Sequence, residues 1–374
     1  MTAARPLRVA MAGIRGVPAN FGGSETAVQE IGRRLADQGI AVTVYCRAHN
    51  SPNRDRSFLG MRRIVLPSIN TFHLDTITHS FLATLHLRLR DAADVIHYHG
   101  MGNALCIPLL WGSQKKAVVT IDGPDWERPK WGPLARRVLK LGAWMATRFA
   151  DRLIIDNHPS VEYFRRAFGV DDAVYIPYGA DRDRPETTVA LAEHGLEPRR
   201  YVLFVGALVP DKGPDILIEA YRQVDTGVPL VLVGDSPFFP EFRRRLREEA
   251  AKDDRVRMLG YVYGPAYREL VAHAYAYVHP LRADGTSPAL LQALGYGSCI
   301  VINSLPEALS AVGDAALSFA RNDVTELAKK LQQVLDDPEL AHRLRGRALE
   351  RARTEYDWDR VTEAHRSVYE RVSA

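Results

Sequence analysis

The sequence predicts an α/β protein built from two doubly wound units, each a mostly parallel sheet with helices on both faces. Short apolar strands alternate with helical segments in both halves, and a polar stretch rich in charge, proline and glycine interrupts them at 179–200. The 374 residues also exceed what one hydrophobic core usually organises. We therefore expect domains at 1–180 and 201–355, a linker at 181–200, and a C-terminal helix at 356–374 that packs on the first domain.

The first half opens with a strand–helix–strand unit. The apolar run 7–14 predicts a buried strand, the periodicity of 24–38 predicts an amphipathic helix begun by a Ser or Thr cap, and 40–46 predicts a second strand. Further strands are predicted at 62–67, 94–99, 116–122, 151–157 and 173–179. Repetition of this unit indicates a parallel sheet.

The second half repeats the architecture without repeating the sequence. Its strands are predicted at 201–208, 229–235, 256–262, 274–280 and 298–303. The chain then ends in helices, and the tail after Tyr356 carries Trp358, Val361, Val368 and Val372 for packing. The two Rossmann-like halves are expected to face each other across a cleft.

Composition excludes several classes of protein. Hydrophobic residues at 46% and charged residues at 25% are ordinary for a globular chain, and no apolar run approaches the ~20 residues of a membrane span. Runs of arginine such as Arg136-Arg137 and Arg243-Arg244-Arg245 have no aromatic residues between them. We therefore interpret them as solvated faces of helices and not as nucleic-acid sites. The three cysteines are far apart, as in a reduced cytoplasmic protein. Peripheral contact with the inner face of the membrane and the oligomeric state stay open.

Three loops have features of anion-binding sites. A helix is predicted to begin at Pro288 with Ser287 as its cap, and such a start presents unpaired N–H groups beyond the carboxyl edge of the sheet. Lys212 and Gly213 occupy the loop after the first strand of the second half; a solvated lysine at a helix start is the alternative. Gly22 and Gly23 precede the first helix, where a ligand could approach the backbone closely.

Metal and nicotinamide sites are not predicted. The Asp-Arg-Asp at 181–183 lies in the expected linker, and His97 and His99 alternate along a strand without a third ligand. The first loop lacks Gly-x-Gly-x-x-Gly, and the strand ending at Cys46 has no acidic residue at its tip to hold a ribose.

Four segments in a fixed order carry a family resemblance: "GIRGVPANFGGSETAV", "DGPDWERPKWG", "IPYGAD" and "GTSPALLQALGYG". Together they resemble the retaining, nucleotide-sugar-dependent glycosyltransferases of family 4, which have the GT-B fold, and within them a bacterial rhamnosyltransferase-type subgroup. The resemblance implies transfer of a hexose or 6-deoxyhexose from a UDP-, dTDP- or GDP-linked donor to a saccharide, lipid-linked or small polar acceptor. It implies neither a metal, nor a resident cofactor, nor a protein nucleophile.

The resemblance also implies a set of site residues. Asp122 lies where many relatives place a histidine near the reacting sugar, and Lys212 would neutralise the donor diphosphate. The implied set is catalytic Asp122, Lys212 and Asp284; donor-binding Gly22, Gly23, Lys212, Tyr261, Gly285, Thr286, Ser287, Leu290 and Gln292; and acceptor-binding Arg15, Asn20, Trp126 and Arg128. For Trp126 and its neighbour Trp131, a role as core anchors stays open.

Three departures from the family pattern concern the donor. Gln292 replaces a carboxylate that would accept two hydrogen bonds from a ribose, a loss of about 1–3 kcal/mol if uncompensated. Asp284 is shorter than the usual glutamate, and Ala207 stands where many relatives have an arginine. These departures keep a second hypothesis open, a non-catalytic or regulatory nucleotide-sugar-binding protein descended from such an enzyme. An epimerase on this fold would need acid–base groups that the motifs do not supply.

Overall fold

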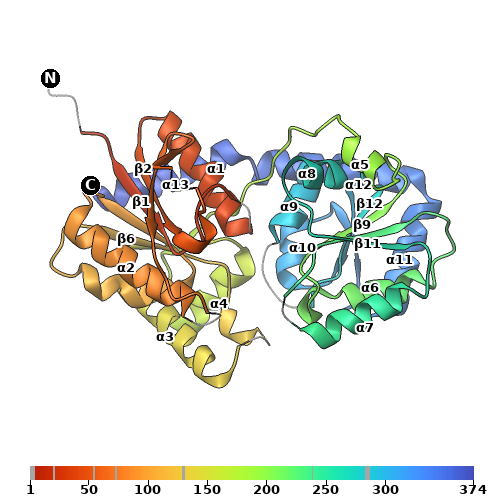
Figure 1. Cartoon of the computed structure of the whole chain (residues 1–374), viewed down its shortest axis with the longest axis horizontal. Coiled ribbons are helices and arrows are strands. Elements are labelled where there is room, and N and C mark those ends of the chain that lie inside the picture. Colours follow the sequence, from red (N-terminus) through yellow and green to blue (C-terminus); the bar gives the residue numbers. More distant parts are fainter. Residues whose placement is uncertain are drawn as a thin grey trace. The chain divides into compact units, whose positions relative to one another are not determined.

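The computed structural model describes residues 5–19, 22–53, 55–71, 74–128, 131–237, 239–282 and 287–374 (Figure 1). The chain divides into two compact units, residues 1–178 together with 358–374, and residues 179–357. Each unit contains one mainly parallel sheet with helices on both faces, which confirms the predicted fold class.

The first unit has an eight-stranded sheet in the order β3-β4-β2-β1-β5-β6-β7-β8. Its strands are β1 (Arg8–Ala12), β2 (Ala41–Arg47), β3 (Ser57–Phe58), β4 (Met61–Leu66), β5 (Val95–His99), β6 (Lys116–Ile121), β7 (Arg152–Ile155) and β8 (Val174–Tyr175). Only the β3–β4 pair is antiparallel among these strands. All the strands predicted for this half are present; β3 is additional. Because the other strands are parallel, the loops that follow them gather at one edge of the sheet.

Two layers of helices cover this sheet (Figure 1). The helices are α1 (Gly23–Asp37), α2 (Asp75–Arg90), α3 (Pro133–Phe149), α4 (His158–Phe168) and α13 (Trp358–Ser373), with short 3-10 segments η1 (Ala48–Asn50), η2 (Met101–Leu110) and η3 (Asp125–Glu127). Helices α2 and α3 both pack on η2, whereas α13 packs on α1, β5 and β6. Alternate strand residues such as Ile96 and Tyr98 face the α2–α3 layer and form its core.

The second unit has a six-stranded sheet in the order β11-β10-β9-β12-β13-β14. Its strands are β9 (Val202–Val205), β10 (Leu230–Val233), β11 (Val256–Gly260), β12 (Ala276–His279), β13 (Cys299–Asn303) and β14 (Ala316–Phe319). Its helices are α5 (Val189–Glu193), α6 (Pro214–Tyr221), α7 (Pro240–Ala250), α8 (Gly264–His273), α9 (Pro288–Gly295), α10 (Pro306–Val312), α11 (Val324–Asp336) and α12 (Pro338–Glu355), with η4 (Pro210–Lys212). All five predicted strands are present, and β14 is additional.

The structure differs from the sequence expectation at two joints. The segment 181–200, expected to be a linker, lies inside the second unit, where α5 packs on α8. Leu191 of α5 is fully buried. The segment therefore contains a packed helix although its composition is mostly polar. Helix α1 begins after Gly22 without a side-chain cap, which corrects the expected Ser or Thr cap.

Candidate functional site

The glycine loop of the first unit is held by the helix that it introduces. Gly22 precedes α1, and Glu25 in the first turn of α1 is buried. The Glu25 carboxylate accepts a hydrogen bond from the Arg15 N–H at 3.1 Å, which ties the loop after β1 to the helix start. Arg15 itself is exposed. The buried negative charge of Glu25 works against a second anion at this helix start, so the loop is better suited to sugar hydroxyls than to phosphate.

Asp122 lies at the carboxyl edge of the same sheet, directly after β6. The Tyr178 hydroxyl donates to Asp122 Oδ1 at 2.8 Å, and the Asn157 amide donates to the Asp122 carbonyl oxygen at 2.6 Å. The Ser24 hydroxyl, in the first turn of α1, also interacts with the Tyr178 phenol. The fold thus brings the predicted Asp122 and the start of α1 to one place, linked through Tyr178.

A second carboxylic acid completes this cluster. Asp156 follows β7, is 1% exposed, and accepts a hydrogen bond from the Asn157 amide at 2.7 Å. Burial and the neighbouring Asp122 carboxylate raise the pKa of Asp156 well above its usual range. Both causes favour the neutral form of Asp156 over its charged form.

The residues predicted to bind the acceptor differ in their surroundings. Trp126 is 4% exposed, and its ring packs near Tyr163, Phe164 and Phe168 with centroids 6.1–6.2 Å away. The prediction that Trp126 offers a face to a sugar is therefore wrong, because its ring is a core anchor. Arg128 forms an ion pair with Asp125 at 2.9 Å. Asn20 lies outside the described residues.

In the second unit, Lys212 ends η4, at the carboxyl edge of the sheet. A Cβ at Gly213 would overlap the Pro280 carbonyl oxygen, and Gly213 has φ +66, so only glycine lets the two loops approach this closely. Arg282 N–H donates to the Asp211 carbonyl at 2.8 Å and fixes the same pair of loops. The positive charge of Lys212 acts on His279 at the tip of β12, where burial first and Lys212 second lower the pKa of His279 to about 3.

The start of α9 is only partly available to a ligand. Ser287 is the N-cap residue, but its side chain makes no capping hydrogen bond. The Leu290 N–H donates to the Ser287 carbonyl at 2.9 Å and the Leu290 side chain is fully buried. Leu290 therefore presents no donor to a ligand, which corrects its predicted role. Asp284, Gly285 and Thr286 lie outside the described residues.

Gln292 has a partner within the protein. Its Nε2 donates to the Asp181 carbonyl oxygen at 3.0 Å, and the same carbonyl would overlap a Cβ at Gly295, one turn further along α9. The chain at Asp181 thus lies directly against this helix. A glutamate at 292 would place a carboxylate oxygen against that carbonyl oxygen, so the amide is the group that this contact requires.

We expect Gln292→Glu to lower the melting temperature rather than to improve nucleotide binding. The substitution loses one hydrogen bond and sets two acceptors in contact, which costs about 1–3 kcal/mol. Thermal unfolding and nucleotide titration of the variant measure both effects. Gln292→Met, which removes the hydrogen bond without adding charge, is the matched control. An unchanged melting temperature with a clear gain in nucleotide affinity would contradict the structural role of the amide.

Tyr261 follows β11 at the carboxyl edge of the second sheet. Tyr261 and Tyr263 are 52% and 57% exposed, and their rings lie nearly parallel at 12° with centroids 5.7 Å apart. Nearby, Arg243 forms an ion pair with Asp235 at 2.9 Å, at the end of β10. Two exposed aromatic rings beside polar groups are suited to contact a flat ligand.

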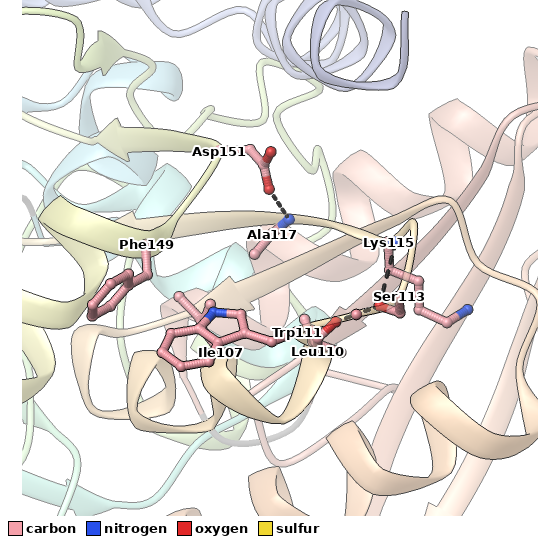
Figure 2. A pocket seen from close by; sticks show the side chains of 9 residues that line it. Ile107, Leu110, Trp111, Ser113, Lys115, Ala117, Phe149 and Asp151 are labelled. Atoms are coloured by element: carbon pink, nitrogen blue, oxygen red, sulfur yellow. Dashed lines mark hydrogen bonds between the residues drawn. The ribbon is translucent and has the colours of Figure 1, made fainter.

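A pocket of about 280 Å³ lies elsewhere, at the opposite edge of the first sheet (Figure 2). Trp111, Lys115 and Phe149 line it, where β6 begins. Figure 2 shows the Trp111 indole turned toward Phe149, while Lys115 lies on the other side. This pocket contains none of the predicted site residues and is not part of the candidate site.

Sequence reasoning missed Asp156, Asn157 and Tyr178. They lie inside the segments 151–157 and 173–179 that the sequence predicts as strands, but the observed strands β7 and β8 end before them, so all three lie at the same sheet edge as Asp122. An acidic residue directly after a buried strand was the available signal for Asp156. Its pairing with Asp122 depends on the strand order β6-β7-β8, which only the fold supplies.

Comparisons with known proteins follow the same division of the chain. Residues 21–184 match the model "Glycosyltransferase Family 4", and residues 189–351 match "Glycosyl transferases group 1". Glycogen synthase of Mycobacterium tuberculosis is 27% identical, over 97% of this chain and 94% of that protein. D-rhamnosyltransferase WbpZ of Pseudomonas aeruginosa is 26% identical over 68% of each chain. The crystal structure of HepE of Anabaena with UDP and glucose has a TM-score of 0.81 at 17% identity, over 98% of this chain and 100% of that one.

Proposed function

Because the chain belongs to the GT-B glycosyltransferases of group 1 and family 4, which transfer sugar from nucleotide-sugar donors, we propose that it is a retaining hexosyltransferase. It moves a hexose or 6-deoxyhexose onto a saccharide, lipid-linked or small polar acceptor, and it needs no metal ion. The observation that carries the proposal is the placement of Lys212 at the carboxyl edge of the second sheet, next to the buried His279, within the residues that match the group 1 model.

The second unit binds the donor in this proposal. The Lys212 ammonium neutralises the diphosphate, supported by the backbone at the start of α9. Tyr261 and Tyr263 contact the base with their exposed rings. One N–H of the Gln292 amide is already bonded to the Asp181 carbonyl, so its carbonyl oxygen and its second N–H are offered to the ribose.

The first unit acts on the sugar and the acceptor. In this proposal Asp122 carries the negative charge of the cluster, because burial favours the neutral form of Asp156, and a carboxylate stabilises an oxocarbenium-like centre. Gly22 and Gly23 contact sugar hydroxyls with their backbone. Arg15, which is exposed, and Arg128 hold the acceptor.

The chemical step follows from charge. Cleavage of the sugar–phosphate bond sends its electron pair to the diphosphate, so the protein gains most by stabilising that leaving group with Lys212 and backbone N–H groups. The leaving phosphate then accepts the proton of the attacking acceptor hydroxyl on the same face of the sugar. The configuration is retained and no protein nucleophile takes part.

Relatives support the donor and the pathway class only in outline. The HepE structure contains UDP and glucose, WbpZ is a D-rhamnosyltransferase, and glycogen synthase makes a polysaccharide. We therefore propose a UDP-, dTDP- or GDP-linked donor and a role in polysaccharide assembly. A 6-deoxyhexose fits the rhamnosyltransferase-type motifs of the first half.

A nucleotide screen tests the proposal. UDP, dTDP and GDP sugars should each be measured by thermal shift, since a donor at about 100 times its Kd stabilises the fold by about 2.7 kcal/mol. Lys212→Met should weaken the binding donor at least tenfold, because a charge-assisted contact is worth about 1.5–3 kcal/mol. Lys329→Met, an exposed lysine on α11, is the control and should bind normally. No shift with any donor, or equal binding by Lys212→Met, would refute the donor site.

The hydrogen bond between Gln292 and Asp181 favours a second candidate function, because it engages the side chain that stands in place of the family's ribose-binding carboxylate. This candidate is a non-catalytic nucleotide-sugar-binding protein. The same screen separates the two. Stabilisation by a donor followed by release of free nucleotide in the presence of saccharide acceptors supports the transferase. Stabilisation without turnover of that donor by any acceptor supports the binding protein.

A further inference from the structure

The outer surface of the α2–α3 layer exposes large apolar side chains in a regular pattern. Helix α3 exposes Leu134 at 75%, Leu141 at 49% and Trp144 at 45%. Arg137 and Arg148 are also exposed on α3, and the spacing 134, 137, 141, 144, 148 places all five residues on one stripe of the helix. A helix that packed this stripe against its own domain would bury it, so its exposure requires another explanation.

The same surface continues onto neighbouring elements. We define the α2–α3 surface as Ile77, Phe81, Leu85 and Leu89 of α2, Trp111 after η2, and Leu134, Leu141, Trp144 and Phe149 of α3, all of which are at least 36% exposed. Arg88 of α2 donates to the Trp111 carbonyl at 2.6 Å, and Trp111 contacts Phe149 edge to face at 5.4 Å. These contacts connect α2 to α3 through η2, on which both helices pack.

The charge on this surface has one sign along α3. The helix sequence PLARRVLKLGAWMATRF carries Arg136, Arg137, Lys140 and Arg148, all exposed, and contains no acidic residue. Arg88 and Arg90 add positive charge at the end of α2. Exposed leucine and tryptophan beside arginine and lysine on one helix are typical of helices that lie in the interface of an anionic bilayer.

We propose that the α2–α3 surface docks on an anionic lipid bilayer, with α3 lying in the plane of the interface. The apolar side chains enter the acyl boundary, and the cations of α3 contact lipid phosphates. None of the described helices is long and apolar enough to cross a membrane, so the attachment is peripheral. The proposal stands apart from the sugar-transfer chemistry, because none of its residues belongs to the candidate site.

A second copy of the chain fits this surface less well. In a two-fold dimer the same patch meets itself, so α3 would bring its own four cations against four identical ones without an acidic partner on that helix. The buried centres of protein interfaces are also depleted of charge. Lipid phosphates supply the missing negative charge, and they remain hydrated at the membrane surface.

Docking would also place the acceptor side at the membrane. Helix α3 begins shortly after the loop that carries Arg128, and it ends at Phe149 beside the pocket of Figure 2. The Lys115 ammonium of that pocket donates to the Asp91 and Ala93 carbonyls at 2.7 and 3.0 Å. Lys115 is therefore occupied, as is Arg88, which donates to the Leu109 and Trp111 carbonyls at 2.6 Å, and the lipid-facing cations are those of α3.

Vesicle binding tests the proposal with the full chain. We expect co-sedimentation with vesicles of equal parts phosphatidylcholine and phosphatidylglycerol, a much weaker interaction with phosphatidylcholine alone, and release at high salt. Trp111 and Trp144 are exposed, so binding should shift tryptophan emission to the blue. Absence of binding to the anionic vesicles would overturn the proposal.

Two surface variants separate the contributions. Leu134→Ser/Leu141→Ser/Trp144→Ser should lower partitioning at least about tenfold and remove most of the blue shift, while Arg137→Gln/Lys140→Gln/Arg148→Gln should lose the preference for anionic lipid. Val189→Ser/Leu349→Ser, on exposed apolar residues of the second unit, should bind like the wild type. All six α3 positions are exposed, so circular dichroism should be unchanged. Wild-type binding by the serine variant, or a dimer that it dissociates in sedimentation equilibrium, would assign the surface to something other than lipid.

Discussion

Replacing Asp122 by asparagine should lower kcat for sugar transfer by about 10²- to 10³-fold, the usual effect of removing one charged group that stabilises a transition state. The Tyr178 and Asn157 contacts survive the change, because an amide oxygen still accepts from Tyr178 and the Asn157 bond goes to the backbone. The loss therefore reports charge and not geometry. Steady-state kinetics with a donor found by the nucleotide screen measure it.

Asp156→Asn is the matched control and should keep nearly full activity. Burial and Asp122 raise the pKa of Asp156, which favours its neutral form in the folded protein, and an amide copies that neutral acid in size. Equal losses in both variants would show that the negative charge is shared between the two residues. A larger loss in Asp156→Asn would place the charge on Asp156 and contradict the assignment.

The same variant should change the pH dependence of stability. In the unfolded chain Asp156 releases its proton near pH 4, whereas in the folded chain it holds the proton to higher pH. The unfolded state therefore binds fewer protons, and the wild-type free energy of unfolding falls as pH rises above about 4. Asp156→Asn removes this contribution, so it should melt higher than wild type at pH 7, with a gap that narrows toward pH 4.

The second large effect is a loss of stability in mild acid. Burial lowers the pKa of His79 and His365 to about 4 and of His99 and His279 to about 3. It also lowers the pKa of His97, which is bonded to the Tyr369 hydroxyl and to Thr120 Oγ1, both at 2.7 Å. These histidines stay neutral when folded but bind protons near pH 6.5 when unfolded.

Each such histidine should remove about 1.4 kcal/mol of unfolding free energy per pH unit below 6.5, until its folded pKa is reached. Four of the five, all except His279, belong to the first unit. Together these four lose on the order of 6 kcal/mol by pH 5.5, which is comparable with the 5–15 kcal/mol stability of a typical domain. We therefore expect the first unit to unfold before the second as the pH falls.

Two spectroscopic probes can follow the units separately. All five tryptophans, Trp111, Trp126, Trp131, Trp144 and Trp358, lie in the first unit, so their emission reports that unit, whereas far-ultraviolet circular dichroism reports both. Circular dichroism should show two transitions as the pH falls, one for each unit. The tryptophan transition should coincide with the first of them, at the higher pH. His99→Asn should reduce the acid slope by about 1.4 kcal/mol per pH unit. His342→Gln, on an exposed side chain, should leave the slope unchanged. If both units unfolded at one pH, the expected effect of the unequal numbers of buried histidines would be contradicted.

The elements of the candidate site could be predicted to different depths. Lys212 and Asp122 follow predicted strands, and parallel strands carry their following loops to one edge, so their placement there follows from pattern alone. Leu290 and Trp126 were placed by the same logic but were wrong. Whether a backbone N–H is already bonded, or a ring already packed, depends on neighbours that are distant in sequence. Gln292 is the clearest case, because its partner Asp181 lies in a segment expected to be a linker.

By itself the sequence determined the alternation of strands and helices, the two-unit division and the order of the family motifs, because these depend on hydrophobic periodicity and local turn chemistry. The tertiary structure decided which acids lie close enough to shift each other's pKa, which side-chain amides are hydrogen-bonded within the protein, and which apolar helix face stays exposed. Those properties depend on burial and on contacts across the sheet. Asp122 and Asp156 are separated by a whole helix in the chain, and they interact only because β6 and β7 are neighbours.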